Sequence, residues 1–555
     1  MRRRIILWSC SPVLLTLMSL ASCRDNPLSV DNSQQPSVTG VFSTPATVEA
    51  AISRAFEQMY NGQLGSGDDL FTQTITMSFE SSSQLGNFGM GTRGSIPRSP
   101  IDNSIGNSVA AGNFRDFDFL SRNARLSASA IAAMDKFIAA NAATGSVGRD
   151  ARARSVAYFE LGYALGNVAL FYDSAAILSP QDPTDALGNF IAPPLSGASA
   201  VMDAAIKYLD SAVVIATAGP ATTIPLDWLG QVSDVTNANY IRILRSYRAK
   251  FRAGFARTPA ARDAADWNAV IADATNGITT DFVVQTSTTT GWRSDVQNQM
   301  AVSTAWSQMT PFILGMADTT GAYDTWLQLA LTARTPFLLR TPDKRFPAGN
   351  TRAVQQALTG NGRGGTPIGS ILYFRNRPTG EDSPAEPWGT WFYDNWRSWG
   401  IRAAGGNGPY VMFAVAENDM LAAEGYLRTG QFTPAVTLIN KYRTRAGLAP
   451  IGAVAAVTDQ VPNSSATAKD CVPRVPQPPN YNTTACGTVF EAMKWEKRIE
   501  TSMIGYGQWF IDSRGWGDLV TGTALEWPVP YQELFARNRG SYTTTAKAVK
   551  GTYGF

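Results

Sequence analysis

Two apolar stripes with helical spacing follow each other between residues 416 and 446 of this chain, separated by a glycine. The first stripe consists of Ala416, Met420, Ala423 and Leu427, and the second consists of Ala435, Leu438, Ile439, Tyr442 and Ala446. Intervals of three and four residues place each set on one face of a helix. Gly430 lies between them, where glycine readily ends a helix. The pattern predicts two helices joined by a tight turn, each with an apolar face that neighbouring helices must cover.

The same spacing recurs nearer the N-terminus, over residues 158–165, 202–216 and 267–274. The turn segment AEGYLRTGQFTPA, residues 423–435, resembles the helix-turn-helix of a tetratricopeptide repeat. No strict period runs through the chain, so we expect degenerate repeats with long insertions. A helix over residues 240–255 carries five basic side chains, which we interpret as a solvated face. The fold class predicted is mostly α.

Residues 282–408 lack clean helical spacing and are rich in Gly, Pro, Thr and aromatic residues. We expect loops here, and loops on a rigid helical frame commonly carry binding residues. One aromatic group consists of Trp292, Trp306, Tyr323 and Trp326, and a second consists of Trp388, Trp391, Tyr393, Trp396 and Trp399. The second group is either another candidate surface or packing beneath a loop.

The N-terminus has the form of a lipoprotein signal over residues 1–22. Arg2, Arg3 and Arg4 precede an apolar run over 5–20, and Leu20-Ala21-Ser22-Cys23 ends it. Cys23 is therefore the predicted lipidation site, followed by a polar tether to residue 45. An acylated N-terminus holds a domain on a membrane without a spanning helix. The alternatives are a transmembrane anchor, disfavoured by the short run, or a cleaved signal with an incidental cysteine.

Charge and composition exclude some functions. The formal net charge is +3, and the signal contains three arginines and no acidic residue, so the mature chain is neutral. A nucleic-acid binder is therefore disfavoured, because such proteins carry a basic surplus. The chain has no histidine, which excludes Ser-His-Asp and Cys-His catalysis and imidazole zinc sites. Chemistry by paired carboxylates remains open.

The chain has four cysteines. Cys10 lies in the signal and Cys23 at the lipidation site, which leaves Cys471 and Cys486. In an exported protein such a pair suggests a disulfide, with two free thiols as the alternative.

Several strings, in this order along the chain, resemble the SusD/RagB family of outer-membrane nutrient-binding lipoproteins. They are CRDNPLSVDN with FSTPATVEAAISRAFEQMYNG, then TPDKRFPA (341–348), AENDMLAAEGYLRTGQFTPAVTLINKYRTRAGL (416–448), and FEAMKWEKRIETSMIGYGQWFIDSRGWGDL (490–519) followed by WPVPYQEL. Within 416–448 the matching positions are Glu417, Ala423, Glu424, Gly430, Ala435, Asn440, Arg443 and Arg445. The collinear order is more specific than any single string.

The resemblance implies four tetratricopeptide-like helix pairs packed against a loop-rich second half, a SusD-like α-solenoid. The nutrient-binding domain would cover 46–555, divided into a helical-repeat half (46–281), a loop-rich insertion (282–408), and the helix pair with the C-terminal hallmark (409–555). It also implies a SusC-type TonB-dependent transporter as partner, an outer-membrane location with surface exposure, a glycan or peptide ligand, and no enzymatic activity, cofactor or metal.

By position in that family, the ligand would meet loops near residues 80–93 and 292–326. The candidate stacking residues are Trp292, Trp306, Tyr323 and Trp326, because flat rings suit the C–H face of a sugar. Asp324 and Asn87 are the polar candidates. In the hallmark, a helical stripe indicates that Trp495 belongs to the core, and we interpret Glu496, Arg498 and Glu500 as holding the fold, with Arg514 among their possible partners.

The leading hypothesis is a lipoprotein that binds oligosaccharides and delivers them to the transporter. The alternatives are a surface glycoside hydrolase with paired carboxylates, a peptide-binding member of the same family, and a purely structural partner of the transporter.

Overall fold

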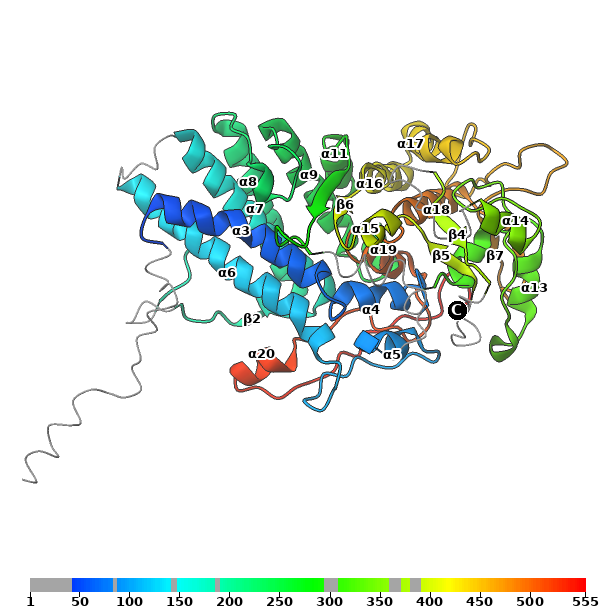
Figure 1. Cartoon of the computed structure of the whole chain (residues 1–555), viewed down its shortest axis with the longest axis horizontal. Coiled ribbons are helices and arrows are strands. Elements are labelled where there is room, and N and C mark those ends of the chain that lie inside the picture. The colour runs from blue at the N-terminus through cyan, green and yellow to red at the C-terminus, as the bar shows by residue number, and fades with distance from the viewer. Residues whose placement is uncertain are drawn as a thin grey trace, which may run out of the picture.

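The computed structural model describes residues 42–82, 87–140, 147–184, 190–293, 308–358, 371–379 and 391–555. Cys23, Trp306 and Trp388 lie outside the described residues, as do the predicted signal and most of the predicted tether. The described chain is predominantly helical, with a few short strands, so the predicted mostly α class is confirmed (Figure 1). No helix in this part of the chain is both long enough and apolar enough to span a membrane.

The longer helices are α3 (Pro45–Leu64), α4 (Leu70–Met77), α6 (Ala111–Ala139), α7 (Val147–Phe171), α8 (Ala198–Ala218), α9 (Asn237–Gly254), α11 (Trp267–Thr275), α16 (Val415–Arg428), α17 (Phe432–Arg445), α18 (Val489–Glu500) and α19 (Gln508–Trp516). The shorter ones are α5 (Met90–Gly94), α10 (Pro259–Asp263), α12 (Pro311–Leu314), α13 (Ala322–Gln328), α14 (Arg352–Ala357), α15 (Trp399–Ala403) and α20 (Tyr531–Ala536). The 3-10 turns are η1 (Asn87–Gly89), η2 (Leu226–Trp228), η4 (Gly315–Ala317) and η5 (Leu331–Ala333).

The helices form a continuous stack in the order α3, α6, α7, α8, α9, α11, α16 and α17, in which each helix packs on the next. In Figure 1 the part from α8 to α17 runs along the upper edge of the molecule. The stack explains the two apolar stripes, because α16 is covered by α11 on one side and by α17 on the other. The predicted helix pair therefore extends the stack, although more than a hundred residues separate α16 from α11 in the sequence.

Local sequence signals set the ends of these helices. Thr44 caps α3 by accepting a hydrogen bond from the Thr47 amide, and Pro45 occupies the first turn, where its missing N–H is not needed. Thr488 caps α18 in the same way. Gly430, between α16 and α17, has φ of +74°, a left-handed conformation that glycine adopts without strain.

Short two-stranded antiparallel sheets accompany the helices, one of them between α7 and α8 and the others in the loop-rich second half of the chain, the irregular half. Their strands are β1 (Ser174–Ala176) with β2 (Leu195–Gly197), β3 (Phe282–Thr286) with β6 (Gly408–Phe413), β4 (Phe374–Asn376) with β5 (Tyr393–Asn395), and β7 (Arg474–Pro476) with β8 (Thr484–Cys486). Because β3 pairs with β6, the two ends of the segment 282–408 meet, with Phe282 opposite Phe413. The chain thus leaves the helical stack after α11 and re-enters it at α16 through one sheet.

The basic face of α9 is not simply solvated, so that prediction was wrong. Lys250 is 3% exposed, and its ammonium lies 3.1 Å from a carboxylate oxygen of Glu417 on α16. Arg248 forms ion pairs with Asp210 on α8 and Asp273 on α11. A buried charge requires such partners, and they come from helices that are neighbours only in the folded stack.

Candidate binding pocket

Three of the four aromatic residues predicted to stack on a ligand, those that the structure describes, lie in the core. Trp292, Tyr323 and Trp326 are 3%, 1% and 2% exposed. Trp292 packs against Tyr60 with ring centres 5.4 Å apart, and Trp326 packs edge-on against Phe312 at 5.0 Å. A ring that stacks on a sugar needs an exposed face. The faces of these rings are covered by neighbouring side chains. Interior packing is therefore the role that the structure assigns to these three aromatic residues.

The remaining predicted contacts do not complete a site either. Asp324 is partly exposed on the short helix α13, beside Tyr323. Asn87 begins η1, but its side chain, like the whole of Trp306, lies outside the described residues. In the second aromatic group, Trp391 and Trp396 are 1% and 0% exposed. Of the two roles predicted for this group, these two residues have the packing role beneath loops.

The two remaining cysteines meet in space. The sulfur atoms of Cys471 and Cys486 form a disulfide 2.04 Å long, which closes a segment of 15 residues next to the β7–β8 sheet. It links the loop ahead of β7 to the last residue of β8, and α18 begins three residues after Cys486.

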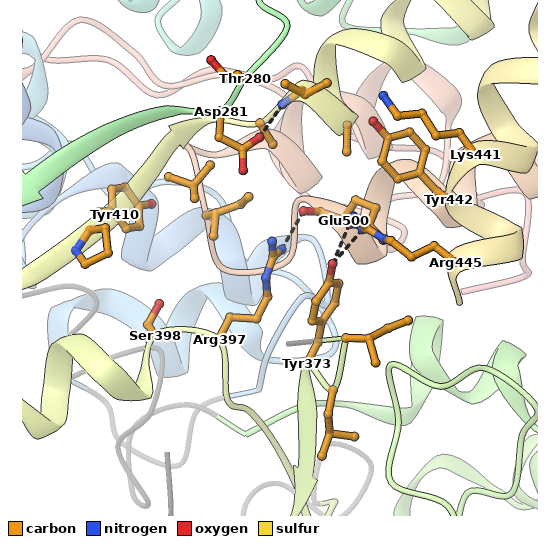
Figure 2. A pocket seen from close by; sticks show the side chains of 18 of the residues that line it. Thr280, Asp281, Tyr373, Arg397, Ser398, Tyr410, Lys441, Tyr442, Arg445 and Glu500 are labelled. Atoms are coloured by element: carbon orange, nitrogen blue, oxygen red, sulfur yellow. Dashed lines mark hydrogen bonds and ion pairs between the residues drawn. The ribbon is translucent and has the colours of Figure 1, made fainter. Parts of the chain in front are cut away.

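A cavity of about 460 Å³ lies where the α16–α17 pair meets the irregular half (Figure 2). Segments from five parts of the chain line it: the residues before β3, those on either side of the β4–β5 sheet, strand β6, the facing ends of α16 and α17, and the end of α18 with the turn after it. The polar and aromatic lining residues are Thr279, Thr280, Asp281, Tyr373, Arg397, Ser398, Tyr410, Lys441, Tyr442, Arg445 and Glu500. The volume is in the range of small-molecule sites.

Glu500, the last residue of α18, forms the centre of one wall. Its carboxylate accepts hydrogen bonds from the Tyr373 hydroxyl (2.7 Å) and from the Arg445 guanidinium, as Figure 2 shows. Arg397 donates to the main-chain oxygen of Glu500 at 2.6 Å and lies over the Tyr373 ring, 4.2 Å from its centre. Three segments distant in the sequence thereby meet at one residue, Glu500.

A buried ion-pair network behind this wall holds Glu500 in place. Arg345 donates to Glu500 (3.1 Å), to Glu496 (2.7 Å) and to both carboxylate oxygens of Asp343 (2.9 and 2.6 Å). Trp495 donates to Asp343 at 3.1 Å and is 1% exposed, as its helical stripe predicts. The TPDKRFPA element is thus bonded to the C-terminal hallmark helix.

The hallmark charges form buried ion pairs that join separate elements of the fold, and Arg514, one of their possible partners, is not among the residues they pair with. Glu496 and Glu500 pair with Arg345, and Arg498 pairs with Asp518. Arg514 instead donates to main-chain oxygens of residues 170, 254 and 525. Spacing along one helix indicated which side chains are buried, but the partners come from other segments.

The protonation states of Glu500 and Tyr373 favour ligand binding over acid catalysis. Burial raises the pKa of the Glu500 carboxyl, but Arg345 and Arg445 outweigh burial and hold that pKa below its ordinary value. Burial raises the pKa of Tyr373 to about 12, against the opposing effect of Arg397. At neutral pH Glu500 is therefore an anion and Tyr373 a neutral hydroxyl. A general acid needs a raised carboxyl pKa, which Glu500 does not have.

The opposite wall presents exposed polar groups. Thr279, Thr280 and Asp281 are exposed, and Asp281 accepts a hydrogen bond from the Val415 amide at the start of α16 (2.8 Å). Lys441 on α17 is 54% exposed and pairs with Asp419 at 2.6 Å. The same Asp419 oxygen accepts a hydrogen bond from Tyr442 (2.6 Å).

The charges around the pocket largely balance within this chain, because the cations Arg397, Lys441 and Arg445 are accompanied by the carboxylates of Asp281, Asp419 and Glu500. Arg445 pairs with Glu500 and Lys441 pairs with Asp419, while Arg397 bonds a main-chain oxygen. Arg445 remains 49% exposed, so part of its guanidinium faces solvent. What the pocket offers a ligand is a set of hydrogen-bond donors and acceptors with little uncompensated charge, which suits hydroxyl groups on a neutral molecule. In the described part of the chain no group of acidic and cysteine side chains is arranged to hold a metal ion.

The sequence contained part of this site without marking it as one. Tyr442 and Arg445 belong to the predicted helix pair, and Glu500 to the hallmark helix, but all three were assigned to the fold. Tyr373, Arg397 and Asp281 had no local signal, because they lie at strand ends whose pairing only the fold establishes. The one sequence signal for the pocket was a charged residue at the end of each of two helices predicted to pack in the core, Arg445 and Glu500.

A stack of antiparallel helix pairs, joined to an irregular half and carrying a polar pocket at their junction, defines a ligand-binding scaffold. Solved structures identify which scaffold it is. A SusD superfamily protein from Parabacteroides distasonis ATCC 8503 matches with a TM-score of 0.55 and 9% identity, over 90% of this chain and 98% of that one. A SusD superfamily protein from Bacteroides vulgatus ATCC 8482 matches with a TM-score of 0.50 and 12% identity, over 86% and 89% of the two chains.

A laminarin binding SusD-like protein also matches, with a TM-score of 0.50 and 12% identity over 90% of this chain and 99% of that chain. No protein-family model and no curated protein matches the sequence. The chain has the SusD fold, and the resemblance inferred from the sequence is confirmed at the level of the fold.

Proposed function

We propose that this protein is a lipid-anchored outer-membrane lipoprotein that binds neutral oligosaccharides in the pocket at the α16–α17 pair. The observation that carries the proposal is the polar, internally neutralised pocket on a SusD fold. Hydroxyl-rich ligands exchange hydrogen bonds with such groups at little electrostatic cost, whereas an unpaired charge on the ligand would meet few free counter-charges. One structure with the same fold is named for laminarin binding, which supports a glycan as the ligand.

The cellular role that we propose is capture and delivery. The lipobox at Cys23 supports attachment to the outer membrane, with the folded domain exposed at the cell surface. A chain that binds sugar without transforming it needs a carrier, and the resemblance to SusD/RagB supports a SusC-type TonB-dependent transporter as that partner.

Isothermal titration of residues 24–555 tests ligand binding. The panel contains neutral oligosaccharides, among them laminarin fragments, and a set of peptides. We expect a neutral oligosaccharide to bind. Binding of peptides alone would favour the peptide-binding alternative, and the absence of binding to every member would contradict the proposal.

Two variants locate the binding site. Arg445→Met removes the half-exposed guanidinium, and we expect the affinity for the bound glycan to fall about tenfold, the effect of losing one charge-assisted hydrogen bond. Thr280→Trp fills the pocket from an exposed position and should abolish binding without removing an internal contact. Arg54→Met on α3 is the control, because Arg54 is also a half-exposed arginine (54%) paired with a carboxylate, Glu57. Equal affinities in all three variants would place the ligand elsewhere.

An assay for glycan hydrolysis tests the alternative that the protein is a glycoside hydrolase. Glu500 is held anionic by Arg345 and Arg445, so it cannot protonate a leaving group at neutral pH. Incubation of the protein with each bound glycan should produce no new reducing ends, and their appearance at a rate proportional to protein concentration would overturn the assignment as a binding protein.

A further inference from the structure

A second cavity, of about 370 Å³, lies apart from the pocket described above and shares none of its lining residues. Its walls are the segment 257–259 at the start of α10, the residues that follow α19, and the segment 547–552 near the C-terminus. The lining residues are Arg257, Thr258, Pro259, Tyr481, Arg514, Gly517, Leu519, Leu525, Lys547, Ala548, Val549, Lys550, Gly551 and Thr552. Four of them are cations and none is acidic.

The two arginines bring charge that the chain only partly neutralises. Arg257 forms an ion pair with Glu526, just outside the cavity. Arg514 is 1% exposed, yet its hydrogen-bond partners are main-chain oxygens at 2.8 to 3.1 Å rather than a carboxylate. Burial lowers the pKa of Arg514 well below its ordinary value, and repulsion from Arg257 adds to that effect while Glu526 opposes it. A buried cation without its own counter-ion favours an anion nearby.

The two lysines lie on the C-terminal wall and are free to meet a ligand. Lys547 and Lys550 are both exposed, and neither forms an ion pair within the described residues. The Lys550 ammonium lies 4.8 Å from the centre of the Tyr481 ring. The Phe555 main-chain oxygen accepts a hydrogen bond from the Gly551 amide (3.2 Å), which holds residue 555 beside this wall.

The cavity also has an apolar wall, formed by Pro259, Leu519, Leu525 and the Tyr481 ring, and two threonines, Thr258 and Thr552, also line it. A ligand that fits must therefore combine an anionic group with a body that has C–H surface. A bare inorganic ion would leave the apolar wall unused, and a neutral sugar would leave the cations unpaired.

We propose that this cavity is a second ligand site, specific for an acidic sugar whose carboxylate or sulfate meets Lys547 and Lys550 while its ring packs on the apolar wall. The site does not depend on the neutral-glycan pocket. It would give the protein two subsites of opposite preference, one for hydroxyl-rich neutral units and one for a charged unit.

Titration of residues 24–555 with glucuronate tests this site, with glucose and inorganic sulfate as matched probes at constant ionic strength. We expect glucuronate to bind, sulfate to bind more weakly, and glucose not to compete with glucuronate. In the double variant Lys547→Gln/Lys550→Gln the affinity for glucuronate should fall about tenfold, because two ion pairs with the ligand are lost. The control is Lys207→Gln/Lys469→Gln, which changes the net charge equally at two other exposed lysines.

Three outcomes would overturn the proposal. They are no binding of glucuronate by the wild-type protein, equal affinities in the two double variants, or binding of sulfate that is tighter than that of glucuronate. The Arg445→Met variant separates the two sites, because it should weaken neutral-glycan binding and leave glucuronate binding unchanged.

Discussion

At the scale of single residues, buried charge holds the parts of this protein together. Arg262, on α10, is fully buried and donates to both oxygens of Glu424 on α16 (2.9 and 2.6 Å) and to Asp512 on α19 (3.1 Å). Burial raises the pKa of Glu424, but Arg262 outweighs burial and lowers that pKa far below its ordinary value. A carboxylate in this environment stays ionised because its partner is already present.

Removing that charge should be costly. We expect Glu424→Gln to lower the free energy of unfolding by about 3–5 kcal/mol, because Arg262 would keep a buried charge with a weakened set of partners. Asp263→Asn is the matched control, since Asp263 pairs with Arg428 but is 70% exposed, and it should cost less than about 1 kcal/mol. Urea unfolding of both variants measures the difference, and equal losses would contradict the role assigned to burial.

Glu80 predicts a pH dependence. Its carboxyl is 3% exposed and accepts a hydrogen bond from the Met503 amide. Burial raises its pKa to about 8, although that hydrogen bond and Arg397 oppose the shift. The folded state therefore binds a proton that the unfolded state releases near pH 4.5. Stability from this group is complete below pH 4.5 and is lost as the pH rises toward 8, by about 1.4 kcal/mol per pH unit.

The variant Glu80→Gln should reduce that slope, measured by urea unfolding at intervals from pH 5 to pH 8. The slope will not vanish, because burial also raises the pKa of Asp116, to about 7, which acts in the same direction. Glu533→Gln, which removes a surface carboxylate paired with Arg537 on α20, should keep the wild-type slope. A wild-type slope in Glu80→Gln would show that Glu80 is ionised in the folded protein.

At the scale of elements, close approach between helices decides which positions must be glycine. Gly166 lies in α7, and a Cβ atom placed there would come within 2.2 Å of the Phe251 ring on α9. In an isolated helix, alanine would be favoured over glycine by about 1 kcal/mol. The packing of α7 on α9 reverses that preference.

We therefore expect Gly166→Ala to lower the free energy of unfolding by about 1–3 kcal/mol, because Phe251 must move. Gly400→Ala in α15 is the control, since no atom lies within 4 Å of the added Cβ, and it should be neutral or slightly stabilising. Thermal unfolding of the pair is the measurement. A stabilised Gly166→Ala variant would mean that α7 and α9 pack less closely than the structure shows.

At the scale of the whole molecule, the helical stack and the irregular half meet at both cavities, so ligand sites and domain architecture are linked. The pocket at the α16–α17 pair needs α16, α17 and α18 together with the ends of strands β3 to β6. The second cavity needs α10, the residues after α19 and the segment 547–552. Neither half of the chain forms such a site alone.

The membrane attachment that we propose is tested on the whole protein. In the variant Cys23→Ser, expressed with its signal, we expect loss of acyl labelling and transfer from the membrane fraction to the soluble fraction. The reason is that each buried lipid CH₂ contributes about 0.8 kcal/mol to membrane attachment. Cys10→Ser, within the predicted signal, should remain labelled. Labelling of the Cys23→Ser variant would contradict the lipobox prediction.

The sequence by itself determined the helices that carry apolar stripes, among them α7, α8, α11, α16 and α17, and the core position of Trp495. These features were predictable because helical periodicity is local, so burial of one face follows from spacing alone. The likeness of several strings to SusD/RagB likewise identified the fold that the solved structures confirm.

Only the tertiary structure decided which aromatic residues line a pocket and which charges pair. Trp292 and Trp326 lie in loop-rich sequence yet are buried, whereas Tyr373 and Arg397 reach the pocket from the ends of paired strands. Lys250 became a core residue because Glu417 lies opposite it on a helix distant in the sequence. The physical reason is that spacing fixes which face of an element is apolar, while the partner of a polar group depends on how separate elements pack.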